Sequence, residues 1–369
     1  MCGFAGFLDC ESTTAAPDWE RVLRGMGDRL YHRGPDEGGH WLDRDAGIGL
    51  AHRRLAILDL SPAGHQPMTS ASGRYVIAFN GEIYNHLMLR AGLGERAWRG
   101  HSDTETLLAA FEAWGIERTL KASVGMFAFA LWDRTERRLT LARDRLGEKP
   151  LYYGWQGRVF LFGSELKALR AHPAFIGDVD RDAVTQLLRH NAIGAPHSIY
   201  RGIRKLPSGT WLQIRDRARS EDEPRPTTYW SLAEVARRGL ETRLSEAIAL
   251  QKVADVPLGA FLSGGIDSST VVALMQSQAD RPVRTFSIGF REQGYDEAEY
   301  AAAVARHLGT EHTELYVTPD EAMAVIPDLP KIWDEPFADS SQIPTYLVSR
   351  MTRARVTVAA ALACSSASS

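Results

Sequence analysis

Apolar residues follow one pattern in the first part of this 369-residue chain and a different pattern later. In the first part, short apolar or alternating runs are separated by glycine and other turn residues, which is typical of strands in layered, mostly antiparallel sheets. Helical spacing between these runs predicts helices packed over the sheets, so we expect an α+β domain. The predicted strands are residues 4–8, 48–51, 55–58, 75–79, 126–132, 139–142 and 159–163, and the predicted helices are 19–29, 104–114 and 181–189.

After this part, the segment 215–226 carries charges of both signs and two prolines, and its apolar residues show no periodic spacing. This composition predicts a surface hairpin or linker. Helices and strands then alternate, which predicts an α/β domain with a parallel sheet covered on both faces. The predicted helices are 232–253, 268–278 and 297–307, and the strands are 258–262, 283–290, 311–317 and 356–358. We divide the chain into domain 1–214, linker 215–230, domain 231–358 and an alanine and serine tail at 359–369.

Composition excludes several classes of protein. With 44% hydrophobic and 24% charged residues, the chain fits neither a disordered, a collagen-like nor a coiled-coil protein. The net charge of −3 gives no basic field for nucleic acid or an anionic membrane. No apolar run approaches the roughly 20 residues of a membrane span, and the start lacks a signal-peptide pattern, so we expect a cytoplasmic protein. An odd set of three cysteines, Cys2, Cys10 and Cys364, fits a reducing compartment.

Cys2 follows the initiator methionine directly. If Met1 is removed, the thiol lies beside a free α-amine, whose ordinary pKa of about 7.7–8.0 suits a general base at neutral pH. An ordinary N-terminal cysteine is the alternative, and context must decide between them. Polar clusters at 32–36, 51–55, 80–85 and 102–105 interrupt the apolar runs and supply that context.

Several short motifs resemble class II, N-terminal-nucleophile glutamine amidotransferase domains, which have the layered fold expected above. They are Met1-Cys2-Gly3, Arg33-Gly34-Pro35-Asp36, Asn80-Gly81-Glu82-Ile83-Tyr84-Asn85, Ser102-Asp103-Thr104-Glu105 and Arg143-Asp144-Arg145-Leu146-Gly147. The resemblance implies that Cys2 attacks the side-chain amide of glutamine, forming a thioester and releasing ammonia. It also implies an oxyanion hole made by the Asn80 side chain and the Gly81 N–H group.

The same resemblance implies a glutamine pocket. Arg54 would pair with the substrate α-carboxylate, while Glu82 and Asp103 would hold the α-ammonium group or orient the amide. Asp103 is also a candidate helix N-cap, and the two roles are compatible. The implied glutamine-binding residues are Arg54, Leu55, Ala56, Ile57, Leu58, Asn80, Gly81, Glu82 and Asp103.

A second motif, Leu262-Ser263-Gly264-Gly265-Ile266-Asp267-Ser268-Ser269, lies between a predicted strand and a predicted helix. Glycines let the backbone approach an anion, and hydroxyls and helix N–H groups supply donors, so a diphosphate fits there. The motif is neither a Walker A loop nor a dinucleotide fingerprint; a plain serine-capped turn is the alternative.

This loop resembles the pyrophosphate loop of ATP pyrophosphatases, in the adenine nucleotide alpha-hydrolase-like fold. The resemblance implies ATP as substrate and Mg²⁺ near Asp267, with Leu262 and Ile288 contacting adenine. Further acidic candidates are Asp296 and residues 333–339, for which solvated turns are the alternative. The implied ATP site comprises Leu262, Ser263, Gly264, Gly265, Asp267, Ser268, Ser269 and Ile288.

The two domains in this order resemble the glutamine-hydrolysing asparagine synthetase family from residue 1 to about residue 358. The resemblance implies that ATP activates aspartate as β-aspartyl-AMP and that ammonia, delivered through a tunnel, displaces AMP to give asparagine. Glutamine, aspartate and ATP are the implied partners, with no nucleic acid and no membrane, and a homodimer stays open.

The alanine and serine tail departs from the family, which carries a second glycine- and acid-rich loop at this point. We expect a frameshifted or prematurely terminated end at 359–369, with glutamine hydrolysis retained and synthetase activity impaired. The alternatives are an amidotransferase for another carboxylate, a β-lactam-forming relative, and a glutaminase-only or non-catalytic remnant. A phosphoribosyl-type amidotransferase shares the first domain but lacks residues 263–269.

Overall fold

The computed structural model describes residues 2–9, 18–216, 218, 224–232, 240–290 and 298–360. The chain forms two compact units, residues 1–236 and residues 237–368, and each is described by itself. Cys10, Asp296, Cys364 and the tail from residue 361 lie outside the described residues.

Unit 1 contains two six-stranded antiparallel sheets. One has the order β10-β8-β9-β1-β3-β2 and the other the order β12-β11-β7-β6-β5-β4. The strands are β1 Gly3–Asp9, β2 Glu37–Asp43, β3 Ile48–Arg54, β4 Met68–Thr69, β5 Tyr75–Ile83, β6 Gly125–Asp133, β7 Arg138–Arg143, β8 Tyr152–Gln156, β9 Val159–Gly163, β10 Arg204–Lys205, β11 Thr210–Arg215 and β12 Thr227–Thr228.

The two sheets face each other across a hydrophobic core. Phe4 of β1 and Leu50 of β3 meet Ala78 of β5 and Trp132 of β6 there. Strand β1 is buried on both faces because the second sheet covers one face and helices cover the other, which explains its continuous apolar sequence. This position fixes the chain start, and therefore Cys2, at the end of a central strand.

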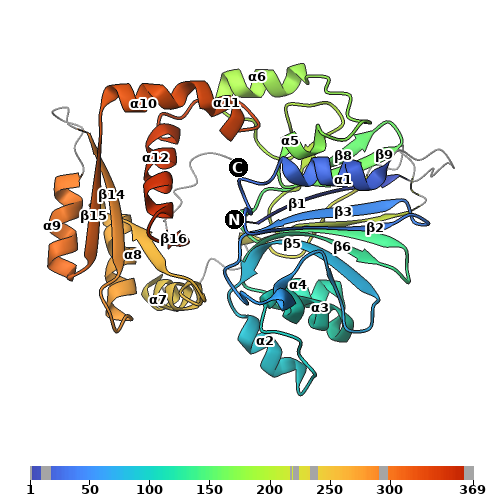
Figure 1. The fold of residues 1–369 in the computed structure, drawn as a ribbon, viewed down its shortest axis with the longest axis horizontal. Coiled ribbons are helices and arrows are strands. Elements are labelled where there is room, and N and C mark those ends of the chain that lie inside the picture. Colours follow the sequence, from blue (N-terminus) through green and yellow to red (C-terminus); the bar gives the residue numbers. More distant parts are fainter. Residues whose placement is uncertain are drawn as a thin grey trace. The chain divides into compact units, whose positions relative to one another are not determined.

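Helices cover the outer faces of both sheets, giving four layers (Figure 1). Helices α1 and α5 pack on the β1 sheet, while α3 and α4 pack on the β5 sheet. The predicted antiparallel α+β fold of this part is therefore confirmed. The helical elements are α1 Trp19–Asp28, η1 Pro62–Gly64, α2 His86–Leu93, α3 Asp103–Trp114, α4 Ile116–Ala122, α5 Leu166–Leu169 and α6 Arg181–His190.

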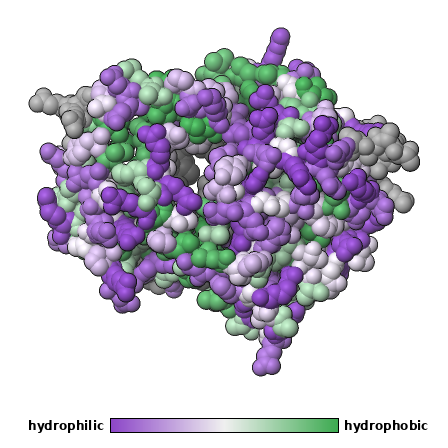
Figure 2. Space-filling model, viewed as in Figure 1, coloured by the Kyte–Doolittle hydropathy of each residue, from purple (hydrophilic) through white to green (hydrophobic). Residues whose placement is uncertain are grey.

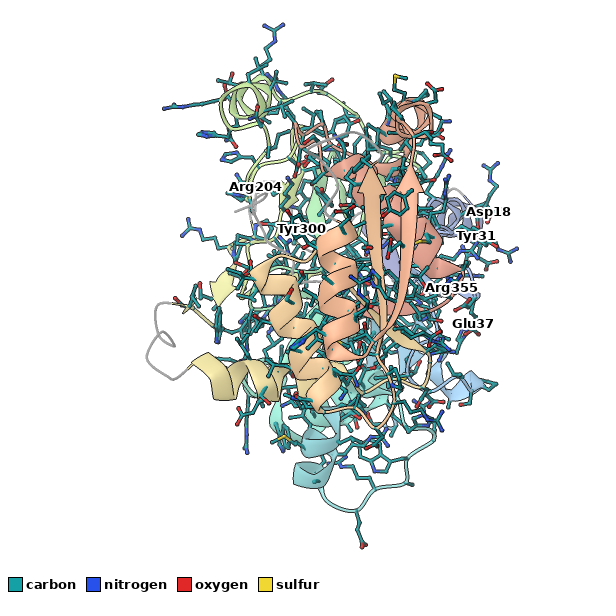
Figure 3. All side chains as sticks on the ribbon, turned by 90° about the vertical axis from the view of Figure 1, so that its left-hand side faces the viewer. Asp18, Tyr31, Glu37, Arg204, Tyr300 and Arg355 are labelled. Atoms are coloured by element: carbon teal, nitrogen blue, oxygen red, sulfur yellow. The ribbon has the colours of Figure 1, made fainter. Side chains whose placement is uncertain are left out.

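Unit 2 contains a parallel sheet of order β15-β14-β13-β16. Helices α8 and α9 pack on one face and α12 on the other, as expected of an α/β domain; in Figure 3 the label Tyr300 marks α9. The elements are α7 Leu240–Gln251, β13 Leu258–Phe261, α8 Ile266–Ser277, β14 Arg284–Phe290, α9 Ala298–Leu308, β15 Glu311–Val317, α10 Pro319–Val325, η3 Ile326–Asp328, α11 Leu329–Ile332, α12 Gln342–Arg353 and β16 Val358–Ala360.

The structure corrects three local predictions. Residues 55–58 form an irregular loop rather than a strand, because the chain leaves the sheet after Arg54. Strand β5 extends beyond the predicted 75–79 to Ile83, because pairing with β6 continues that far, so Asn80-Gly81 lies within the strand. The last strand is β16 at Val358–Ala360, later than the predicted 356–358, and it pairs with β13.

Unit 2 exposes apolar side chains on its surface. Met323 and Ile326 are 56% and 50% exposed, and green atoms lie among purple ones along α10 in Figure 2. Among the described residues, no helix is both long and apolar enough to cross a membrane.

Candidate active site

Cys2 lies just before β1, against the first residue after β3. Its Sγ is 3.4 Å from the Leu55 nitrogen, which donates to it, and 3.5 Å from the Leu55 carbonyl oxygen, which accepts from it. Burial raises the pKa of the Cys2 thiol above its ordinary value. The thiol therefore needs a base to act as a nucleophile at neutral pH.

The backbone of Cys2 is held by an arginine. Arg33 Nε donates to the Cys2 carbonyl oxygen at 2.9 Å, and Arg33 Nη1 pairs with Glu165 at 2.7 Å. Lys167 and His32 also contact the Glu165 carboxylate, at 2.9 and 3.0 Å. These partners outweigh the effect of burial and lower the pKa of Glu165 to about 2, so an ionised carboxylate anchors the arginine.

Asn80 is the most unusual polar residue of the pocket. It is fully buried in β5, yet neither its amide nitrogen nor its amide oxygen has a hydrogen-bond partner in the described part of the chain. A buried amide without partners costs free energy, so such a group in a folded protein calls for an explanation. A ligand oxygen at the Asn80 amide would satisfy it.

One pocket joins Cys2 and Asn80 to residues from four other segments. Its walls come from the starts of β1, β6 and α3, the loop after β3, the end of β5, and the turn before β8. The lining residues are Cys2, Leu55, Ile57, Leu58, Gly64, Gln66, Phe79, Asn80, Gly81, Glu82, Ser102, Asp103, Thr104, Met126 and Lys149.

The structure therefore places most of the predicted glutamine site around one pocket. Arg54 and Ala56 are the exceptions, because neither lines its wall. The Arg54 guanidinium pairs with Glu37 at 3.2 Å and donates to the carbonyl oxygens of Asp59 and Ser61. In this arrangement Arg54 holds the loop that forms the wall, and its contact with a substrate carboxylate stays a prediction.

Two carboxyl groups lie in the pocket, and burial raises the pKa of both. The pKa of Glu82 reaches about 8 through burial and the nearby charge of Asp103. Asp103 Oδ2 accepts the Ile83 N–H group at 2.8 Å. The helix N-cap is Ser102, whose Oγ accepts from Glu105, so the alternative in which Asp103 caps α3 is wrong.

Sequence reasoning did not assign four polar residues of the wall to the site: Gln66, Ser102, Thr104 and Lys149. Burial lowers the pKa of Lys149 to about 8. The Lys149 backbone is fixed by Asp144, whose carboxylate accepts its N–H group at 2.9 Å. The only sequence signal was position, since Lys149 lies two residues beyond the motif that ends at Gly147.

The serine and glycine loop of unit 2 lies between β13 and α8. Ser263 and Ser268 hydroxyls are 2.9 Å apart, and Ser268 Oγ also accepts the Ser263 N–H group at 3.2 Å. Gly264 has φ +78°, and a Cβ there would lie 2.7 Å from Tyr300 Cβ. These contacts shape the loop, while Asp267 is exposed in the first turn of α8.

The two residues predicted to contact adenine pack on opposite faces of the sheet. Leu262 is buried with α8 and α9 on one face of the sheet, whereas Ile288 packs with residues of α12 on the other. The structure does not bring these two side chains together. In the acidic run 333–339, Asp339 accepts the Ser341 N–H group in the turn before α12.

Whether Mg²⁺ could bind here is judged from the carboxylate and other donor side chains that are present. No group of three or more His, Cys, Asp and Glu side chains that could hold a metal ion occurs among the described residues. Mg²⁺ usually takes one or two carboxylates together with substrate phosphates, so one exposed Asp267 beside the loop fits an ion that arrives with ATP.

Comparison with known proteins agrees with these features. The glutamine amidotransferase domain family matches residues 1–230, and the asparagine synthase family matches residues 239–361. Asparagine synthetase (glutamine-hydrolyzing) 1 of Bacillus subtilis is 33% identical over 97% of this chain. Putative asparagine synthetase (glutamine-hydrolyzing) 2 of Methanocaldococcus jannaschii is 36% identical, also over 97%. Amidase chry2 of Gibberella zeae is 30% identical over 84%.

Unit 1 thus combines a layered antiparallel fold and a pocket at Cys2 with a match to the glutamine amidotransferase domain family. With both domain matches in order, the chain belongs to the glutamine-hydrolysing asparagine synthetase family. It spans 57% of the length of the Bacillus subtilis relative, 73% of the Methanocaldococcus jannaschii relative and 50% of the Gibberella zeae relative.

Proposed function

We propose that unit 1 hydrolyses glutamine to glutamate and ammonia. The observation that carries the proposal is the buried Asn80 amide, which lacks partners in the described residues and lines the same pocket as Cys2. Acyl transfer needs a nucleophile and a preorganised donor for the oxyanion, and this pocket offers both.

After Met1 is removed, the Cys2 α-amine takes the thiol proton while Sγ attacks the side-chain carbonyl carbon of glutamine. The carbonyl oxygen becomes an oxyanion, which the Asn80 amide and the Gly81 N–H group stabilise. When the intermediate collapses, the carbon–nitrogen bond breaks, the amine returns the proton, and ammonia leaves. Water then hydrolyses the thioester, which gives glutamate and restores the thiol.

Other residues of the pocket recognise the substrate. Glu82 and Asp103 are the candidates for the α-ammonium group of glutamine, because they are the carboxyl groups of the pocket. A bound cation would lower the raised pKa of Glu82, so substrate binding and ionisation of that carboxyl favour each other.

Unit 2 is proposed to activate a carboxylate with ATP. The loop from Ser263 to Ser269 would bind the leaving diphosphate, and Asp267 would hold Mg²⁺, which neutralises phosphate charge. The acceptor proposed is aspartate, whose β-carboxylate would attack the α-phosphorus to give β-aspartyl-AMP and diphosphate. Ammonia would then displace AMP and form asparagine. Another carboxylate is the second candidate acceptor, because the motifs for glutamine and ATP do not specify the acid that is amidated.

Two assays test the proposal. We expect glutamate release from glutamine by the wild-type chain and its loss in Cys2→Ala, and equal rates in the two proteins would refute the assignment. For unit 2, we expect formation of AMP and diphosphate that depends on aspartate. Dependence on a different carboxylic acid would favour the second acceptor, and no nucleotide turnover with any acceptor would leave glutaminase as the only activity.

A further inference from the structure

The outer edge of β5 loses its strand partner before it reaches the pocket. Strand β4 has only two residues, and it pairs with Val76 and Ile77. In a strand, successive N–H groups point to opposite edges. Tyr84 donates to Val124, the residue just before β6, so the N–H groups of residues 79, 81 and 83 point to the outer edge.

Side chains accept two of these three N–H groups. Gln66 Oε1 accepts from Phe79 at 2.7 Å, and Asp103 Oδ2 accepts from Ile83 at 2.8 Å. Gly81 lies between them, and it lines the pocket with Cys2. Gln66 and Asp103 thus hold the strand on either side of the N–H group that is proposed to bind the oxyanion.

Gln66 is itself fixed in place. It is 5% exposed, and its Nε2 donates to Thr104 Oγ1 at 3.3 Å, in the first turn of α3. One side-chain amide therefore connects the strand that carries Asn80 to the helix that carries Asp103. Because its oxygen accepts a backbone N–H group and its nitrogen donates to a hydroxyl, both ends of the amide are used.

We infer that Gln66 is a positioning residue for the oxyanion hole: it replaces the missing strand partner at Phe79 and so sets the position of Asn80 and Gly81. This inference rests on the proposed glutaminase function. Oxyanion donors act mainly in the transition state, so a displaced donor lowers kcat more than it changes KM.

The test compares two variants on the same strand. Gln66→Met keeps side-chain length but removes the acceptor for Phe79. Ser70→Ala is the matched control, because Ser70 Oγ accepts the Tyr75 N–H group at 3.1 Å at the far end of β5. We expect kcat for glutamate release to fall about 10- to 100-fold in Gln66→Met with KM within about threefold, and to stay within about twofold in Ser70→Ala.

Alkylation of Cys2 by iodoacetamide separates positioning from general damage, since that reaction forms no oxyanion. We expect wild-type alkylation rates in Gln66→Met. If that variant does not fold, Thr104→Val, which removes only the outer partner of Gln66, is expected to lower kcat about three- to tenfold with unchanged alkylation.

Three results would overturn the inference. They are an unchanged kcat in the folded variant, a fall of kcat and alkylation together, and an equal fall of kcat in Ser70→Ala. If one of these results is found while Cys2→Ala still loses glutamate release, the inference fails and the proposed function stands. A wild-type chain that releases no glutamate would overturn both.

Discussion

The proposed chemistry depends most on one residue, Asn80. Its amide is buried without partners in the described residues, so a ligand oxygen that accepts from the amide nitrogen would offset part of the free energy lost by burying it. The transition state supplies the strongest such ligand, because its oxygen carries a negative charge.

Replacing Asn80 by alanine should therefore impair the chemical step more than binding. We expect Asn80→Ala to lower kcat for glutamate release by about 10²- to 10³-fold, as for loss of one oxyanion donor elsewhere. Steady-state kinetics measure this, with iodoacetamide alkylation of Cys2 as the control for an intact pocket. A kcat within tenfold of wild type would contradict the role given to the amide.

Glu165 gives a pH-dependent contribution to stability. Its pKa is about 2 in the folded chain, below its ordinary value of 4.5, because its cationic partners favour the ionised form. The stabilisation is therefore fully present above about pH 4.5 and is lost as the pH falls toward 2. At about 1.4 kcal/mol per pKa unit, its size is on the order of 3 kcal/mol.

We expect Glu165→Gln to destabilise unit 1 at pH 7 and to matter much less near pH 2. Urea unfolding of both proteins at the two pH values, followed by tryptophan fluorescence, measures the difference. Glu20→Gln is the control, because Glu20 and its partner Arg44 are both more than half exposed and such pairs contribute little. An equal effect of Glu165→Gln at both pH values would refute the ion-pair explanation.

For single residues, the sequence pointed to those that belong to distinctive motifs. It did not point to residues whose place in the pocket depends on contacts made only in the folded chain. Cys2 and Asn80 were predictable from their motifs. Gln66 and Lys149 were not, because a glutamine before proline and a lysine in a turn carry no signal until the chain folds around them. Arg54 was assigned to the substrate, but in the structure its guanidinium contacts Glu37 and the loop carbonyls.

Strand β5 shows why the bounds of a strand cannot be predicted from its local sequence alone. Asn80-Gly81 reads locally as a hairpin turn, yet pairing with β6 carries the strand straight through it to Ile83. Gly81 is required there for space, since a Cβ would lie 2.3 Å from the Met126 carbonyl oxygen. The glycine thus serves close strand packing rather than a turn.

We expect Gly81→Ala to shift β5 against β6, to destabilise unit 1 by about 1–3 kcal/mol and to abolish most glutamate release. Gly25→Ala is the matched control, because Gly25 lies in α1 with nothing within 4 Å of an added Cβ. That change should stabilise the chain by about 0.5–1 kcal/mol. Urea unfolding and the glutamate assay measure both, and a stable, active Gly81→Ala protein would contradict the packing argument.

The loop before α8 makes a separate prediction for unit 2. Gly264 has φ +78° and lies against Tyr300, so alanine there is strained by both backbone conformation and space. We expect Gly264→Ala to lose nucleotide-dependent diphosphate release at least tenfold while glutamate release is unchanged. A parallel loss of both activities would show that the substitution acts on the whole chain rather than on this loop.

For the whole molecule, the change in apolar pattern was enough to predict two fold classes in order. The short alternating apolar runs in 1–214 correspond to the two antiparallel sheets. The order of helices and strands after the linker corresponds to the parallel sheet. What the pattern did not contain was the path of loops such as 55–58, which are set by contacts with distant residues. Those loops form the pocket, so the site was predictable in its motifs but not in its walls.

The central claim is that Cys2 becomes an N-terminal nucleophile that forms a thioester with glutamine. Mass spectrometry of the chain, quenched during turnover with glutamine, tests this most directly. The account predicts an N-terminal peptide that begins at Cys2 and carries one glutamyl group on its sulfur, absent from Cys2→Ala. An active chain that retains Met1, or one whose glutamyl group lies on another residue, would contradict it.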